Sequence, residues 1–129
     1  GGRKGTGVRW ANWKRAGGVR VVQGGLVRLP RCDGLWAQDD DIAIGVIQAV
    51  RQARRQDDLF IVGGGGMKDM VKRVMDGDEL TPVDVLYPPA MIETAMELTV
   101  LKFTSQIPVS GEYILGSPLI NQENAADYY

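Results

Sequence analysis

The sequence contains no histidine, a single cysteine and no long apolar run. Without histidine, the usual zinc sites and histidine-based acid–base catalysis are excluded. The lone Cys32 cannot form a disulfide within the chain. No apolar run approaches the roughly eighteen residues of a membrane span, and no signal peptide is recognisable. We therefore expect a mature or truncated chain for which most enzyme templates are excluded.

The composition is typical of a single folded domain. Apolar residues make up 44% and charged residues 24% of the 129 residues, which is unlike a disordered or fibrous chain. We therefore expect one hydrophobic core.

Charge is unevenly distributed along the chain. Residues 1–31 carry eight Lys or Arg, eight Gly and no acid, whereas the other 98 residues carry seven basic and sixteen acidic residues. A basic arm for nucleic acid is one interpretation, but no helix-turn-helix or RNA-binding signature accompanies it, so no nucleic-acid partner is expected. Because glycine weakens regular structure, we expect the weakest order here, with 1–12 as a poorly specified start.

Two patterns compete before residue 30. Residues 6–12 are compatible with an edge strand. Within 14–29, the apolar run 19–22 between two glycine pairs favours a strand. The spacing of Val19, Val22, Leu26 and Leu29 instead lines one helical face, with Pro30 as a stop. Local patterns alone leave this choice open.

From residue 33 onward, strands and helices alternate. Apolar strands are predicted at 35–38, 59–62 and 83–87, and amphipathic helices follow the first two. The first helix is expected to bury Ala43, Val46, Ile47, Val50 and Ala53 and to end near Arg54. The second is expected to bury Met67, Met70, Val71, Val74 and Met75, and to end at Gly77.

This alternation predicts an α/β fold with a doubly wound, mainly parallel sheet and helices on both faces. The three strands are expected to be parallel neighbours in one sheet. A last helix should begin after Pro88 and Pro89, before an irregular tail at 105–129. Its expected inward side chains are Ile92, Ala95, Met96, Thr99 and Phe103.

Three features near the strand ends are candidates for chemistry. The glycine run 63–66 resembles a phosphate-binding turn, but it lacks a GxGxxG register and a P-loop lysine, so a permissive turn is favoured. The carboxylates at 39–41 suit a cation, a phosphoryl acceptor or a helix cap; a ligand role and a capping role for Asp39 remain open. Asp40 and Asp41 are expected to serve only as caps and first-turn charges.

The third feature is a pair of aromatic residues, Trp13 and Tyr87, at predicted strand-to-helix junctions. Aromatic faces beside a carboxylate suit a flat polyol. Trp13, Asp39, Gly65 and Tyr87 each follow a predicted parallel strand, and ligands bind outside the carboxyl ends of such strands. We therefore expect these four residues to form one wall of a ligand cleft.

The segments DGLWAQDDDIAIGVIQAV, IVGGGGMKDMVKRVMDGD and PLINQENAADYY resemble the carboxyl-terminal lobe of ribose-type periplasmic sugar-binding proteins of ABC transporters. The resemblance covers 12–129 and implies a helix at 14–29. It also implies that 1–129 is a single partial domain, without the amino-terminal lobe and the first strand and helix of the second lobe.

By position, the resemblance implies that Trp13 stacks on the sugar and that Asp39 bonds ring hydroxyls. Tyr87 stands near a usual Gln. Where the family has an Asp that grips the sugar, this chain has Gly64 and Gly65, so that contact is missing or differently supplied.

The function implied is periplasmic capture of a monosaccharide or related polyol between two lobes and its delivery to a membrane permease. No enzymatic activity, cofactor or metal ion is expected. An alternative is the effector domain of a LacI-type repressor, which shares the architecture; the tail sequence and the lack of a DNA-binding headpiece favour transport. A nucleotide-using enzyme, suggested only by 63–66, is the least favoured class.

Overall fold

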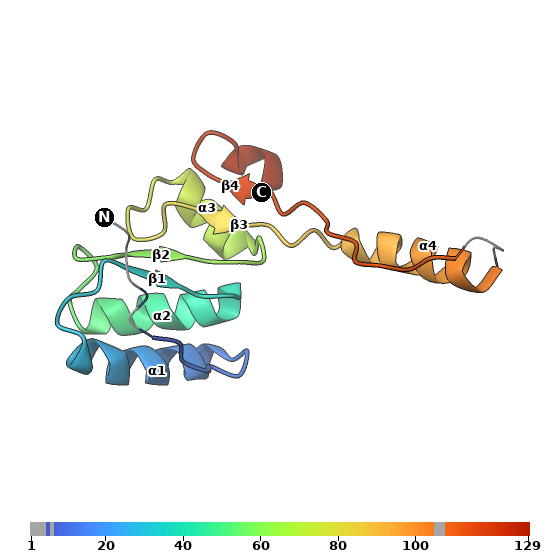
Figure 1. Ribbon diagram of the computed structural model, residues 1–129. Coiled ribbons are helices and arrows are strands. Elements are labelled where there is room, and N and C mark those ends of the chain that lie inside the picture. Colours follow the sequence, from blue (N-terminus) through green and yellow to red (C-terminus); the bar gives the residue numbers. More distant parts are fainter. Residues whose placement is uncertain (1–4, 6, 105–107) are drawn as a thin grey trace.

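The computed structural model describes residues 5, 7–104 and 108–129. Figure 1 shows a layered α/β core and a long arm that carries one helix away from it. Among the described helices, none is long and apolar enough to cross a membrane.

The sheet has the predicted parallel order. β1 (Gly34–Trp36) pairs in parallel with β2 (Phe60–Val62), with Leu35 opposite Ile61. β3 (Asp84–Val85) lies beside β2, where parallel bridges join Val62 to Val83 and Gly65 to Leu86. The prediction that three strands are parallel neighbours is therefore confirmed.

A fourth strand comes from the tail. β4 (Leu119–Ile120) pairs antiparallel with β3, and a short helix, η1 (Ala125–Tyr128), follows it. Ile120 is fully buried. The expectation of an irregular tail at 105–129 is therefore wrong for the described part, 108–129, and residues 105–107 lie outside the described residues.

Helices cover both faces of the sheet (Figure 1). α2 (Asp40–Gln52) lies on one face with α1 (Arg15–Arg28) packed against it, and α3 (Lys68–Met75) lies on the other face beside η1. The predicted doubly wound arrangement is confirmed.

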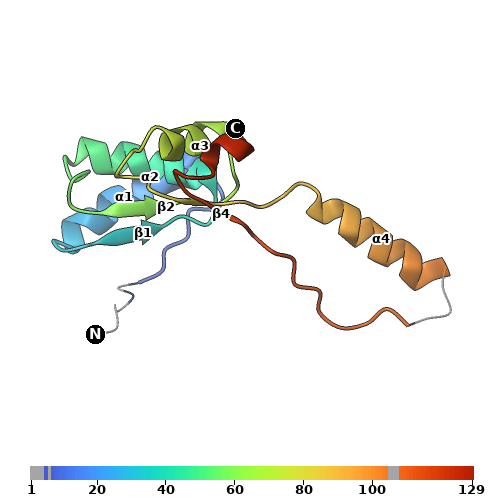
Figure 2. The same ribbon diagram turned by 90° about the horizontal axis from the view of Figure 1, so that it is seen from above.

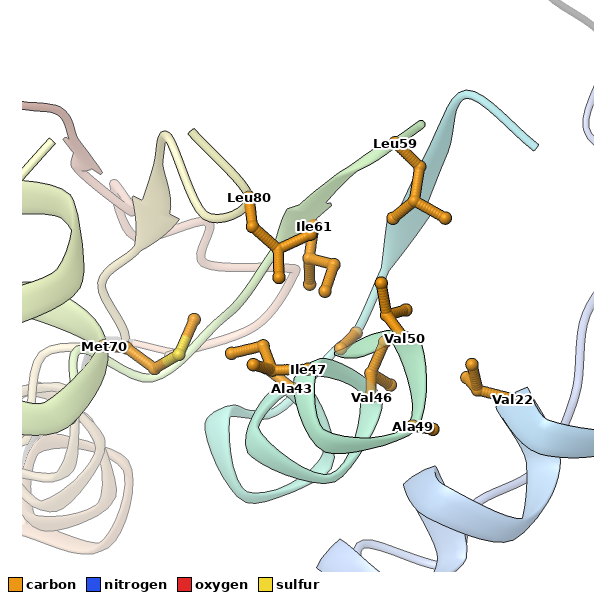
Figure 3. Packing of buried hydrophobic residues seen from close by; sticks show 11 residues of the cluster. Val22, Ala43, Val46, Ile47, Ala49, Val50, Leu59, Ile61, Met70 and Leu80 are labelled. Atoms are coloured by element: carbon orange, nitrogen blue, oxygen red, sulfur yellow. The ribbon is translucent and has the colours of Figure 1, made fainter. Parts of the chain in front are cut away.

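The main core lies between α2 and the parallel strands (Figure 3). Its buried members come chiefly from α2 and β2, including Val46, Ile47, Val50 and Ile61. Each such side chain contributes about 1.5–3 kcal/mol on burial. Ala53 is exposed, contrary to expectation, because α2 ends at Gln52 and Ala53 is its C-cap.

The segment before residue 30 is a helix, α1, and the strand interpretation at 19–22 is wrong. Its glycines allow close packing on α2. A Cβ on Gly18 would lie 2.6 Å from the Ile42 carbonyl oxygen, and a Cβ on Gly45 would overlap the Arg15 carbonyl. The glycines that weaken α1 as an isolated helix therefore permit its contact with α2.

Gly45→Ala should destabilise the fold by about 1–3 kcal/mol, because the added methyl group forces α1 and α2 apart. Gly24→Ala is the matched control, since a Cβ there meets nothing within 4 Å and alanine stabilises an exposed helical position by about 0.4–1 kcal/mol. Urea denaturation measures both variants. Equal stability of Gly45→Ala and wild type would contradict the close crossing.

The last predicted helix forms, but its expected burial is wrong. All 14 residues of α4 (Met91–Thr104) are described and none is buried. Figure 2 shows α4 on an arm that projects from the core. The inward stripe fails because the described chain places no surface against it. Its residues Ile92, Ala95, Met96, Thr99 and Phe103 are all exposed.

Before α1, the described residues 7–12 form no strand, so the expected edge strand at 6–12 is absent there. Residues 1–4 and 6 lie outside the described residues, so the expectation of weak order at 1–12 stays a prediction.

Candidate functional site

The candidate site lies at the carboxyl ends of β1, β2 and β3, where α2 and α3 begin (Figure 1). This edge collects the segment 38–41, the glycine run 63–66 and Tyr87. We call it the ligand edge.

Asp39 is the N-cap of α2. Its Oδ1 accepts hydrogen bonds from the Asp41 N–H at 2.9 Å and the Ile42 N–H at 3.3 Å. Among the described residues, no hydrogen bond engages its Oδ2. The capping interpretation is therefore correct for Asp39, and one carboxylate oxygen remains uncommitted to the protein.

The triplet 39–41 sends its three side chains to different places. Asp39 caps α2, Asp40 is buried, and Asp41 forms a 2.6 Å ion pair with Arg15. Within the described residues, no group of three or more His, Cys, Asp or Glu side chains is placed to hold a metal ion.

Gly65 and Tyr87 meet at the ligand edge. The Gly65 N–H donates to the Val85 carbonyl at 2.8 Å. A Cβ on neighbouring Gly64 would lie 3.3 Å from the Tyr87 hydroxyl and 3.4 Å from the Gln38 carbonyl oxygen. Asp39 follows Gln38 and Gly65 follows Gly64, so three of the four predicted residues lie at this place or next to it in the chain.

Trp13 lies at this end of the molecule, but it is not placed there by a strand as predicted. It follows no strand in the described chain; it lies in a turn with φ of 57° and is 68% exposed. The ion pair between Arg15 and Asp41 places the start of α1 beside the start of α2. Trp13 is thus at the same end, but among the described residues no hydrogen bond joins it to the other three.

Sequence reasoning missed a buried carboxyl pair. Asp40 is 1% exposed and accepts from the Gly64 N–H at 2.9 Å and the Met67 N–H at 2.7 Å. Asp84 is 0% exposed and accepts from the Val85 N–H at 2.9 Å and the Gly66 N–H at 3.2 Å. The signal for Asp84 was a lone acid inside an apolar strand.

The two carboxyls share one narrow space. A Cβ on Gly63 would lie 2.6 Å from Asp40 Oδ1 and 2.8 Å from Asp84 Oδ1, so only glycine fits beside the pair. Burial raises the pKa of both, and with the neighbouring Asp40 charge it brings the pKa of Asp84 to about 7. Below about pH 7, Asp84 is therefore the carboxyl of the pair that holds a proton.

This pair also argues against a phosphate site. The N–H groups of Gly64, Gly66 and Met67, which a phosphate would need, already donate to Asp40 or Asp84. A buried acid pair beneath the glycine run further repels an anion.

The family model for periplasmic binding protein domains matches residues 4–101 of this chain. The chain belongs to this family. Curated relatives of the periplasmic binding protein family include the xylitol-binding protein of Mycolicibacterium smegmatis, 38% identical over 69 residues. The ribose import binding protein of Salmonella typhimurium is 34% identical over 67 residues. These matches cover 53% and 52% of this chain, but only 20% and 22% of the relatives.

Solved structures of periplasmic binding proteins share the fold. A Caulobacter myo-inositol binding protein with bound myo-inositol has a TM-score of 0.75 at 25% identity, covering 91% of this chain and 40% of the other. An ABC transporter solute-binding protein of Actinobacillus succinogenes with bound D-allose has a TM-score of 0.76 at 23% identity, covering 93% and 42%. The chain therefore spans less than half the length of these structures.

One feature of this periplasmic binding protein domain follows from its own backbone. Gly65 has φ of 146°, which residues with a side chain rarely adopt, and its Cβ would lie 3.0 Å from Asp40 Oδ2. An aspartate at this position would be strained and would stand against a carboxylate.

Asp40→Ala should destabilise the fold by about 1–3 kcal/mol, because it leaves the buried Gly64 N–H without an acceptor and also removes the part-buried hydrogen bond from Met67. Asp41→Ala is the matched control and should cost about 1 kcal/mol or less, because its ion pair is half exposed. Urea denaturation at pH 6 compares them. Similar losses would restore the expectation, wrong in this structure, that Asp40 is only a first-turn charge.

Proposed function

We propose that this chain is part of a solute-binding protein of an ABC transporter and that its ligand is a monosaccharide or related polyol. Family membership supports the class of protein. The observation that carries the proposal is the ligand edge, where Asp39 keeps a carboxylate oxygen that no described residue bonds and where the Tyr87 hydroxyl lies against Gly64.

The chemistry of the ligand edge suits a neutral polyhydroxylated molecule. Hydroxyl groups donate to a carboxylate and also accept from a phenol, and a charged acceptor is worth about 1.5–3 kcal/mol per hydrogen bond. Trp13 offers an exposed aromatic face at the same end of the molecule. The relatives support this ligand class, since two are named for binding xylitol or ribose and two solved structures hold D-allose or myo-inositol.

We further propose that the ligand is enclosed by a second lobe of a longer protein. α4 exposes Ile92, Met96, Val100 and Phe103, an apolar surface too large for an isolated helix in water. Because the chain covers only 40–42% of the related structures, an amino-terminal lobe is the expected partner of this helix. One wall alone should bind weakly.

The remaining functional proposals follow from the family. We propose that the protein acts in the periplasm, or anchored outside the cytoplasmic membrane, that it delivers its ligand to a membrane permease, and that it catalyses no reaction. The comparisons give no support to the LacI-type repressor alternative, since the relatives reported above are named as binding or import-binding proteins.

Asp39→Ser should weaken sugar binding by about 1.5–3 kcal/mol, roughly ten- to 150-fold, while leaving stability nearly unchanged. Serine retains the N-cap of α2 but removes the charged acceptor. Titration calorimetry of the two-lobed protein with ribose, xylitol, D-allose and myo-inositol measures the effect. Asp41→Ser is the control; if it lost affinity while Asp39→Ser did not, the ligand assignment would be wrong.

Trp13→Ala should weaken binding by about 1 kcal/mol, roughly fivefold, through loss of a stacking face. Trp13→Phe should retain most of the affinity. Trp10→Ala is the control, because Trp10 is also exposed, at 84%, but has no assigned role. Equal affinity of Trp13→Ala and wild type would remove Trp13 from the site.

A further inference from the structure

The buried carboxyl pair connects α2 and β3 to the glycine run of the ligand edge. Asp40 lies in the first turn of α2 and accepts hydrogen bonds from the N–H groups of Gly64 and Met67. Both residues lie in the segment that leads from β2 into α3. Asp84 lies in β3 and binds the Gly66 N–H. The conformation of residues 63–67 therefore depends on how these two carboxyls are placed.

We propose that Asp40 and Asp84 share one proton, and that this proton acts as a latch that holds residues 63–67 in the conformation seen here. When the proton is lost, the latch opens and the ligand edge is disturbed. The latch itself is independent of any ligand. Only its consequence, weaker ligand binding when the latch is open, depends on the proposed function.

The geometry favours a shared proton. An ideal Cβ on Gly63 would lie 2.6 Å from Asp40 Oδ1 and 2.8 Å from Asp84 Oδ1, so both oxygens border the same glycine, and both residues are essentially inaccessible to water. Two ionised carboxylates this close in a low-dielectric interior repel strongly, so one of them stays protonated. Ionising the second carboxyl must push the two side chains apart. Because each accepts hydrogen bonds from backbone N–H groups within 63–67, that backbone must move as well.

No cation relieves this repulsion within the described residues, because neither carboxyl forms an ion pair with Lys or Arg. β2 and β4 contain no ionisable group. Asp41 is paired with Arg15, and Lys68 lies over the Tyr129 ring. Around the pair, the ionisable groups at the starts of α2 and α3 and after β3 are Asp39, Asp41, Lys68, Asp69 and Tyr87. The cations farther along these helices are engaged elsewhere, since Arg51 and Arg73 pair with Asp78 and Lys72 pairs with Asp76.

Of these, Asp39 acts on the pair electrostatically. Its charge further raises the pKa of Asp40, after the larger effect of burial. The pKa of Asp84 is raised from 3.8 to about 7, chiefly by burial and then by the Asp40 charge. The closed state therefore keeps a proton that an opened, hydrated state releases above about pH 4.

The sign of the pH dependence follows from this difference. A carboxyl whose pKa is raised in the closed state stabilises that state most at low pH. The closed state should weaken by up to about tenfold per pH unit between pH 4 and 7, and should not weaken further above the pKa of the closed state. This direction is opposite to that of a carboxylate held by a salt bridge.

Amide hydrogen exchange of the 129-residue chain between pH 5 and 9 tests the latch. Protection factors of the Gly64, Gly66 and Met67 amides, corrected for intrinsic exchange, should fall by up to about tenfold per pH unit below pH 7 and then level off. Asp84→Asn keeps a donor to Asp40 but has no proton to lose, so its protection should not vary with pH. Asp41→Asn is the control and should behave as wild type.

Constant protection of the three amides across this range in wild type would overturn the proposal. If Asp84→Asn does not fold, the carboxyl carbon chemical shifts of wild type decide: one carboxyl of the pair should titrate near pH 7, and titration of both below pH 5 would overturn the shared proton.

Sugar binding is measured separately on the two-lobed protein, with ribose, xylitol, D-allose and myo-inositol at pH 5.5 and 8. Weaker binding at pH 8 supports the coupling of the latch to the ligand edge, and equal binding overturns it. If the amides titrate as expected but no sugar binds at either pH, the latch stands and the proposed function fails.

Discussion

The hydrogen bonds of Asp40 are the constraint on which the ligand edge depends. They tie the first turn of α2 to the glycine run after β2, and Asp84 extends the same network into β3. Three consecutive strand ends are thereby fixed by two side chains. The surrounding glycines have no Cβ to fill this space. The carboxyl oxygens of Asp40 and Asp84 fill it instead, as packed apolar side chains do elsewhere in the core.

The alternation of strands and helices was predictable because each buried face of the core follows a regular period, as in Val46, Ile47 and Val50 of α2. The tail strand was not predictable, because Leu119 and Ile120 are too short a run to show a period. The buried stripe of α4 was predicted wrongly for another reason. A sequence pattern identifies an apolar face, but burial also requires a partner surface, and the described chain supplies none.

The candidate site divides in the same way. The placement of Asp39, Gly65 and Tyr87 at one edge was predictable because parallel strands end at a common edge, a rule that needs only strand positions. Asp39 and Asp40 have separate roles because successive residues at the start of a helix point in different directions. Asp39 caps α2 at its end, whereas the side chain of Asp40 points into the core. No periodicity distinguishes adjacent acids at a helix start, so this difference required coordinates.

Gly65 and Asp84 are best understood together. The resemblance places a sugar-gripping aspartate in the family where this chain has Gly64 and Gly65, and the backbone at Gly65 disfavours any side chain. A carboxyl group instead lies beneath the run, at Asp84, where it is fully buried and bonded to backbone amides. The Asp40 carboxylate, whose Oδ2 lies 3.0 Å from where a Gly65 Cβ would be, would repel a further acid there, so the absence of an acid at Gly65 and the buried pair are mutually consistent. Compared with the pattern that the resemblance implies, the ligand edge therefore offers one fewer charged acceptor.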